Sequence, residues 1–222
     1  MSAVIDLFAL DDLLGWIQLS IAVPLRASTV AGERDPDRPL IDRVLGGDRR
    51  AASDLFRRHA DDVYRRLTRL VGPDPEREDL VQEVFVAAFR GLDRFRGDSS
   101  FSTWLYRVVV HVAYGHLRRR RRRPLDLDAA IERVPLDPAL TPEALAARQQ
   151  QLARAMRFLD RLKPDKRIAF VLRTVEGMSL QEIAVVVEAK PAAVGQRVKH
   201  AQRELAAMIQ RDERRRAREV GR

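Results

Sequence analysis

Aromatic and basic side chains alternate along residues 95–123, a mixture typical of sites that bind single-stranded nucleic acid. The segment begins with Phe95 and ends with six consecutive arginines. The aromatic residues between them are Phe101, Trp104, Tyr106 and Tyr114. In such sites unpaired bases stack on the rings while cations follow the phosphates. Two plainer interpretations stay open: the rings could be core residues, and the arginine run could be a disordered tract that binds any polyanion.

The helix predicted from Thr103 into the arginines gathers its polar residues on one face. Steps of four, three and four residues connect Arg107, His111, Tyr114 and Arg118. The opposite stripe consists of Leu105, Val109, Val112 and His116. The arginine run therefore extends an organised stripe, and we expect Arg118 and Arg119 to contact phosphates, while residues 121–123 would form a frayed, salt-sensitive end.

Composition narrows the class of protein. The chain has 222 residues, of which 45% are hydrophobic, enough for packed cores. Its formal net charge of +9 favours a polyanionic partner. There are no cysteines, and the four histidines lack metal-ligand spacing, so we predict no metal, no cofactor and no small-molecule substrate. Aspartates interrupt the apolar N-terminus, which predicts no membrane insertion.

Helical periodicity predominates between breaks rich in proline and charge, which predicts an all-α protein with two small helical domains joined by a flexible linker. The expected parts are an extension at 1–39, a first domain at 40–123, a linker at 124–140, a second domain at 141–210 and a basic tail at 211–222. The second domain is predicted to begin with Thr141 as a helix cap and Pro142 at the first helical position. The extension carries an apolar stripe between residues 7 and 21. It is either an amphipathic arm or an inessential addition.

Residues 79–95 form a strongly amphipathic helical pattern. One face holds the apolar residues Leu80, Val81, Val84, Phe85, Ala88 and Leu92. The other presents Asp79, Gln82, Glu83, Val86 and Arg90. The segment 95–100 then reads as a loop, with Ser99 or Ser102 as the expected cap of the next helix.

The C-terminal half carries a helix-turn-helix pattern. Ser179 and Glu182 form a capping box before a short helix, and Pro191 opens a second helix. That second helix turns Val194, Val198, Ala201 and Leu205 inward, and Ala192, Gln196, Lys199, His200 and Arg203 outward. Such a helix enters the DNA major groove, although a helical hairpin with a solvated basic face would show the same pattern.

Together these motifs resemble the extracytoplasmic-function (ECF) class of bacterial RNA polymerase sigma factors. EDLVQEVFVAAFRGLDRFRGDSSFSTWLYRVVV resembles their region 2, which melts the promoter, and MSLQEIAVVVEAKPAAVGQRVKHAQREL resembles their region 4. The ordered pair of motifs is far more specific than a helix-turn-helix alone. The resemblance implies a subunit that binds core RNA polymerase and directs initiation at −35 and −10 elements, with no catalysis of its own.

The resemblance also implies roles for particular residues. Core polymerase would bind Asp79, Gln82 and Glu83. The unpaired −10 strand would bind Phe95, Arg96, Ser99, Ser100, Phe101, Trp104, Arg107, His111, Tyr114, Arg118 and Arg119. The −35 duplex would bind Ser179, Gln181, Ala193, Gln196, Arg197, Lys199, His200 and Arg203. An anti-sigma factor that covers these surfaces is a further implied partner. The N-terminus lacks the basic start and small-residue cleavage site of a signal peptide, so the expected location is the cytoplasm.

The sequence departs from the family pattern at three places. His111 replaces a usual asparagine, Gly115 replaces a polar residue, and the recognition helix reads AAVGQR where TVKSR is usual, with Gly195 inside it. Promoter preference therefore does not transfer from relatives. The main alternative is a free-standing helix-turn-helix regulator, which would have no use for the Asp79–Gln82–Glu83 face. An RNA- or membrane-binding basic protein comes next, and an enzyme is least favoured.

Overall fold

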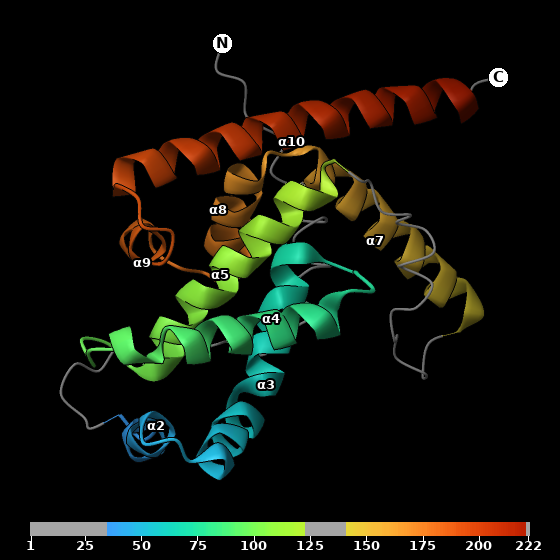
Figure 1. Ribbon diagram of the computed structural model, residues 1–222. Helices are drawn as coiled ribbons and strands as arrows, with labels where there is room; N and C mark the ends of the chain where they lie inside the picture. The colour runs from blue at the N-terminus through green and yellow to red at the C-terminus, as the bar shows by residue number, and fades with distance from the viewer. Residues whose placement is uncertain (1–34, 123–140, 221–222) are drawn as a thin grey trace. The chain divides into compact units, whose positions relative to one another are not determined.

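A computed structural model describes residues 35–122 and 141–220, and every regular element within these two ranges is a helix (Figure 1). The all-α prediction is confirmed. The apolar stripe predicted for residues 7–21 and the predicted linker lie outside the described residues. The chain divides into two compact units that meet in sequence between Leu117 and Arg118.

The first unit is built from α2 (Arg38–Leu45), α3 (Arg49–Val71), α4 (Arg77–Arg90), the 3-10 helix η1 (Leu92–Arg94) and most of α5 (Phe101–Arg120). Asp48 begins α3 by accepting hydrogen bonds from the backbone N–H groups of Arg50 at 2.8 Å and Ala51 at 3.2 Å. Hydrogen bonds from Arg43 and from these amides hold the pKa of the Asp48 carboxyl below its usual range. Gly72 ends α3 at a φ of 79°, a conformation that favours glycine.

The core of this unit is formed by the apolar faces that periodicity predicts. Leu80, Val81, Val84, Phe85, Ala88 and Leu92 are all buried. From α5 the same holds for Leu105, Val109, Val112 and His116. The predicted helix at 79–95 is split in the structure: α4 ends at Arg90, Gly91 follows, and the 3-10 turn continues to Arg94.

The second unit is built from α7 (Pro142–Arg161), α8 (Pro164–Thr174), α9 (Leu180–Val186) and α10 (Pro191–Val220). The Thr141 hydroxyl caps α7 by accepting from the Ala144 N–H at 3.3 Å, as the Thr-Pro pair predicts. The Ser179–Glu182 capping box is also confirmed, with bonds of 2.7 and 3.2 Å in the two directions. Backbone and hydroxyl hydrogen bonds from Ser179 lower the pKa of the Glu182 carboxyl.

The turn between α9 and α10 forms a helix-turn-helix with close packing. Glu188 adopts a left-handed φ of 51°, and the Ala189 N–H returns to the Ala184 carbonyl at 3.0 Å, which closes α9 in a Schellman motif. A Cβ placed on Gly195 would lie 3.4 Å from Leu180 Cδ1. The unusual glycine of the second helix therefore lies at a close contact with the first.

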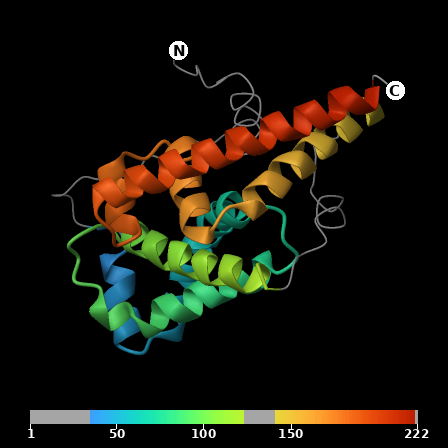
Figure 2. The ribbon, with the colours of Figure 1, turned by 90° about the horizontal axis from the view of Figure 1, so that it is seen from above.

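The C-terminal helix is longer than the sequence predicts. Residues 211–220, expected as part of a ragged tail, continue α10 as one uninterrupted helix (Figure 2). No proline or glycine interrupts the chain between Gln196 and Val220. Asp212 lies 2.9 Å from Arg154 Nε of α7 and 3.1 Å from Arg216 Nε, so ion pairs with a neighbouring helix and within α10 support the extra turns.

Candidate nucleic-acid interface

Three aromatic rings meet where the 95–100 loop enters α5. The Phe101 ring centroid lies 5.8 Å from Phe95 and 5.7 Å from Trp104, and the Phe95 and Trp104 centroids are also 5.7 Å apart. Phe101 is fully buried and Phe95 nearly so, whereas Trp104 is partly exposed. Of the three rings in this cluster, Trp104 is the one that is partly exposed, and the two phenylalanines pack against it.

The loop itself is held at both ends and exposed between them. Phe95 and Phe101 are buried, while Arg96 is exposed and Ser99 is partly exposed. Ser100 Oγ accepts from the Thr103 N–H at 3.2 Å and lies 2.9 Å from Thr103 Oγ1, so Ser100 caps α5. The expectation that Ser99 or Ser102 is the cap is wrong, because α5 begins two residues earlier than Thr103.

The predicted polar stripe of α5 lies at the surface. His111, Tyr114 and Arg118 are exposed and Arg107 is partly exposed. Arg107 Nε is buried with no hydrogen-bond partner among the described residues. The Arg107 side chain is partly exposed, and its position three residues after Trp104 places cation and ring on one side of the helix.

The arginine run is not uniform. Arg118, Arg119 and Arg120 form the last turn of α5, where positive charge is favourable, and Arg121 and Arg122 follow as an exposed turn. Arg118 and Arg119 are exposed, but Arg120 is buried and donates to Asp160 of the same compact unit at 2.5 Å. Arg123 lies outside the described residues. Of the three arginines in the last turn of α5, Arg118 and Arg119 are thus the exposed ones.

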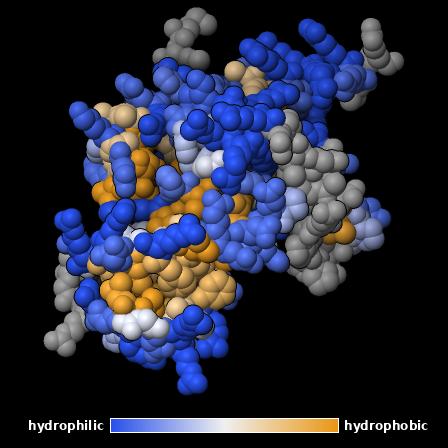
Figure 3. Space-filling model, viewed as in Figure 1, coloured by the Kyte–Doolittle hydropathy of each residue, from blue (hydrophilic) through white to orange (hydrophobic). Residues whose placement is uncertain are grey.

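The polar face of α4 is exposed as predicted. Asp79, Gln82 and Glu83 are exposed beside Val86, which keeps 49% of its surface open to solvent. Figure 3 shows hydrophobic surface over α4 in the lower part of the view. An acidic face with an apolar component suits a protein partner better than a polyanion.

The outward face of α10 carries the predicted recognition residues. Gln196, Lys199, His200 and Arg203 are exposed, and Val194, Val198, Ala201 and Leu205 are buried beneath them. On α9, Gln181 is exposed and Ser179 is occupied by its capping role. Ala193 is partly exposed, and Arg197 Nε lies 3.6 Å from Asp165 Oδ2. Arg197 is therefore shared between an internal ion pair and the surface.

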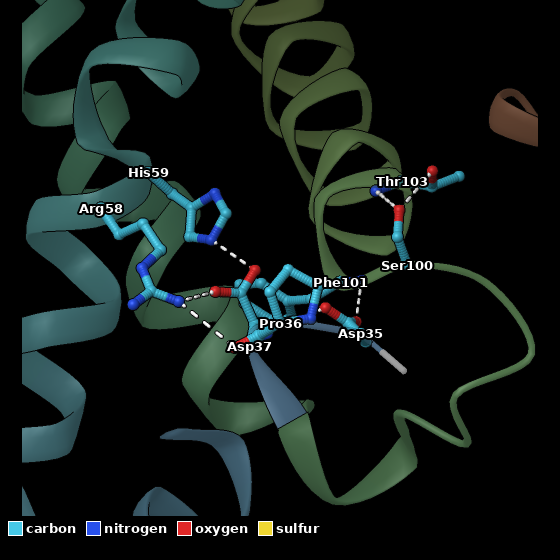
Figure 4. A network of polar contacts seen from close by, with 8 residues as sticks. All are labelled: Asp35, Pro36, Asp37, Arg58, His59, Ser100, Phe101 and Thr103. Carbon is cyan, nitrogen blue, oxygen red and sulfur yellow. Dashed lines mark hydrogen bonds and ion pairs between the residues drawn. The ribbon is translucent and has the colours of Figure 1, made fainter. Parts of the chain in front are cut away.

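Sequence reasoning missed a polar network that lies directly before α2. Asp35 and Asp37 bond to the start of α5 and to Arg58 and His59 of α3 (Figure 4). Burial raises the pKa of the Asp37 carboxyl, but hydrogen bonds and charge from His59 and Arg58 outweigh it, and the pKa lies below its usual value. The Asp-Pro-Asp sequence was assigned to the extension, and periodicity gives no signal for contacts made so far along the chain.

Within residues 35–122 and 141–220, no cluster of histidine, aspartate or glutamate could hold a metal ion. In the same ranges no helix is long and apolar enough to cross a membrane.

Comparison with known proteins places both halves of this geometry in one family. Residues 55–123 match the family model for sigma-70 region 2, and residues 150–205 match that for sigma-70 region 4. The chain is 34% identical over 184 residues to the RNA polymerase sigma-H factor of Pseudomonas aeruginosa, covering 80% of this chain and 95% of the relative. It is 35% identical over 185 residues to the ECF RNA polymerase sigma-E factor of Escherichia coli K12, covering 80% and 96%.

A solved structure shows a similar arrangement of helices. CnrH, determined in complex with the cytosolic domain of CnrY, aligns with a TM-score of 0.54 and 29% identity, covering 79% of this chain and 98% of that one.

Proposed function

The chain belongs to the ECF class of RNA polymerase sigma factors, and we propose that it holds the unpaired −10 strand on the 95–100 loop and α5, reads the −35 duplex with α10, and binds core polymerase through α4. As a sigma factor it binds core RNA polymerase and directs promoter-specific initiation. The residue assignments, and the division into region 2 at 40–123 and region 4 at 141–210, are the proposal.

One observation carries the −10 assignment: a partly exposed Trp104 rests on buried phenylalanines, and the partly exposed Arg107 lies one helical turn further along α5. Flipping a base from the duplex costs a few kcal/mol, and stacking on a ring returns about 1–3 kcal/mol. Trp104 supplies the ring, Arg107 the cation, and His111, Tyr114, Arg118 and Arg119 continue the contact along α5. Arg96, Ser99 and Ser100 line the loop, while Phe95 and Phe101 support the ring.

The −35 assignment follows the geometry of a recognition helix. Gln196, Lys199, His200 and Arg203 face the base edges, since they form one exposed stripe over a buried face. Ser179, Gln181, Ala193 and Arg197 lie nearby and contact the backbone of the duplex. Phosphate contacts give affinity here, and the stripe gives specificity.

The protein works in the cytoplasm, where core polymerase and the chromosome are, and it supplies no catalytic chemistry. A regulatory protein of the anti-sigma type covers the polymerase- and DNA-binding surfaces, and the complex of CnrH with the cytosolic domain of CnrY supports such a partner. The competing free-standing regulator has no role for the Asp79–Gln82–Glu83 face.

The test is reconstitution with core RNA polymerase on a genomic promoter library. We expect new start sites, core binding lost in Asp79→Arg, and promoter opening reduced at least fivefold in Trp104→Ala and Arg107→Ala with core binding kept. Asp61→Arg and Arg57→Ala are matched controls, because both residues are exposed on α3 outside the proposed interfaces. The absence of initiation, together with protection of a palindromic operator by the chain alone, would establish the free-standing regulator instead.

A further inference from the structure

Three residues ahead of α2 tie two helices together. Asp35 Oδ2 accepts a hydrogen bond from the Phe101 backbone N–H at 2.5 Å, and its Oδ1 accepts from the Asp37 N–H at 3.0 Å. Phe101 is 66 residues away in sequence and is the first residue of α5. Figure 4 shows the Asp35 carboxylate directed at this amide, while Ser100 turns to Thr103.

The Asp35 bond satisfies a donor that the helix cannot. The first N–H groups of a helix have no intrahelical acceptor, and a carboxylate there also meets the positive end of the helix dipole. Ser100 serves the Thr103 N–H, so Asp35 and Ser100 divide the first turn between them. The start of α5 is thus fixed by one local residue and one distant residue.

Asp37 anchors the same segment to α3. Its Oδ1 accepts from Arg58 Nη1 at 2.7 Å and its Oδ2 lies 2.8 Å from His59 Nε2, with only 5% of the side chain exposed. A buried carboxylate is retained at low cost only when it is paired and fully hydrogen-bonded, which both oxygens achieve here. The segment therefore cannot shift without leaving Asp37 unpaired.

The anchor reaches Trp104 through one residue. The His59 ring meets the Phe101 ring edge-on with centroids 5.2 Å apart, and Phe101 stacks on Trp104 at 5.7 Å. Both the backbone and the ring of Phe101 are therefore held by the Asp35–Asp37 network. Its other ring neighbour, Phe95, begins the exposed loop.

We propose that Asp35 and Asp37 are positioning residues for promoter opening, which fix the start of α5 so that Trp104 and the 95–100 loop are preformed for an unpaired base. This inference rests on the proposed function of that site. It assigns a role to the last residues of the extension, which contact no DNA themselves but set the geometry of the groups that do.

Two substitutions of different severity at Asp35 test the positioning role. Asp35→Ala removes both acceptors and leaves only backbone amides unpaired, so it is milder for folding than a change at Asp37. Asp35→Asn keeps one carbonyl oxygen that can accept from the Phe101 N–H and should restore part of the activity. Asp61→Ala, from the exposed surface of α3, is the control.

The full-length variants are measured in holoenzyme. The rate of promoter opening is followed by the fluorescence of 2-aminopurine in the −10 strand. We expect Asp35→Ala to slow opening about tenfold, and Asp35→Asn to give an intermediate rate. Affinity for core polymerase and for a −35 duplex should stay within about twofold of Asp61→Ala. In the free chain with a Trp16→Phe background, which leaves Trp104 as its one tryptophan, the Trp104 emission should shift to the red as the ring loses its support.

If Asp35→Ala opens the promoter at the same rate as Asp61→Ala, the inference is overturned. It is also overturned if Asp35→Ala loses affinity for core polymerase and for the −35 duplex as much as it loses opening, because that result would show general unfolding. Trp104→Ala separates this failure from failure of the proposed site. If Trp104→Ala slows opening and Asp35→Ala does not, the site stands and the positioning role is wrong. If Trp104→Ala opens normally, the site itself is wrong and the inference falls with it.

Discussion

The Asp37 carboxylate stabilises the fold only while it is charged. Its two oxygens face Arg58 and His59 of α3, and these partners lower its pKa below the ordinary 3.8. A carboxyl whose pKa is lower in the folded state than in the unfolded state stabilises the protein at pH values above its pKa in the unfolded state. That contribution is lost as pH falls from about 3.8 through the folded pKa.

We therefore expect Asp37→Asn to reduce the free energy of unfolding by about 1–3 kcal/mol at pH 7, because two charge-assisted hydrogen bonds are weakened. The difference in free energy of unfolding between Asp37→Asn and the wild type should become smaller as the pH is lowered from 4 to 3. Urea unfolding at a series of pH values, followed by circular dichroism, measures it. The exposed control Asp61→Asn should show no such narrowing, and a difference that stays constant with pH would contradict the assignment.

The aromatic residues show what residue type alone leaves undecided. Phe95, Phe101 and Trp104 all suit base stacking by composition, and all suit a core. Burial separates them, since Phe101 has no exposed surface and Trp104 keeps some. The sequence therefore located the cluster, but packing decided which member faces solvent.

Helix ends differ in how much local sequence reveals. The Ser179–Glu182 box and the Thr141 cap are confirmed because each is complete within four residues. The start of α5 was misplaced because its first N–H group bonds to Asp35, far along the chain. The C-terminal turns of α10 were missed because their charges pair with Arg154 of another helix.

The turn of the helix-turn-helix contains a strained residue. Glu188 is the one non-glycine residue with a positive φ in the described ranges, and a side chain there costs about 1 kcal/mol or more. We expect Glu188→Gly to raise the free energy of unfolding of the second unit by about 0.5–1 kcal/mol, because glycine adopts this conformation without strain.

Thermal unfolding of Glu188→Gly, compared with Glu176→Gly before the turn, measures this effect. Binding to a −35 duplex should be unchanged within about twofold, since the substitution preserves the α9–α10 geometry. A lower midpoint of thermal unfolding in Glu188→Gly would mean that the Glu188 side chain makes a stabilising contact that outweighs its backbone strain.

For the whole molecule, the last residues of the predicted extension pack as part of the first unit. Asp35 and Asp37 belong to the network of the first unit, whereas the amphipathic arm predicted earlier in the extension lies outside the described residues. Removing residues 1–38 would therefore delete the network together with the arm. A truncation that ends at residue 34 tests the arm by itself.

We expect the chain lacking residues 1–38 to be less stable than the chain lacking residues 1–34 by about 2 kcal/mol or more, because Arg58, His59 and the Phe101 amide lose their acceptors. Urea unfolding of both truncations measures the difference. Equal stability would show that water replaces the carboxylates without cost. A change in solubility or partner binding in the chain lacking residues 1–34 would support the hypothesis of an amphipathic arm.

The sequence by itself determined the helical class, the faces of α4, α5 and α10, and the ordered pair of motifs that identifies the family. These properties depend on periods of three and four residues and on caps complete within one turn, so they can be read locally. Tertiary structure decided which ring of the cluster is exposed, which arginine of the run is taken by Asp160, and what holds the first turn of α5. Each of these depends on a partner at least 40 residues away in sequence or on burial by several elements together, and no local pattern records such a partner.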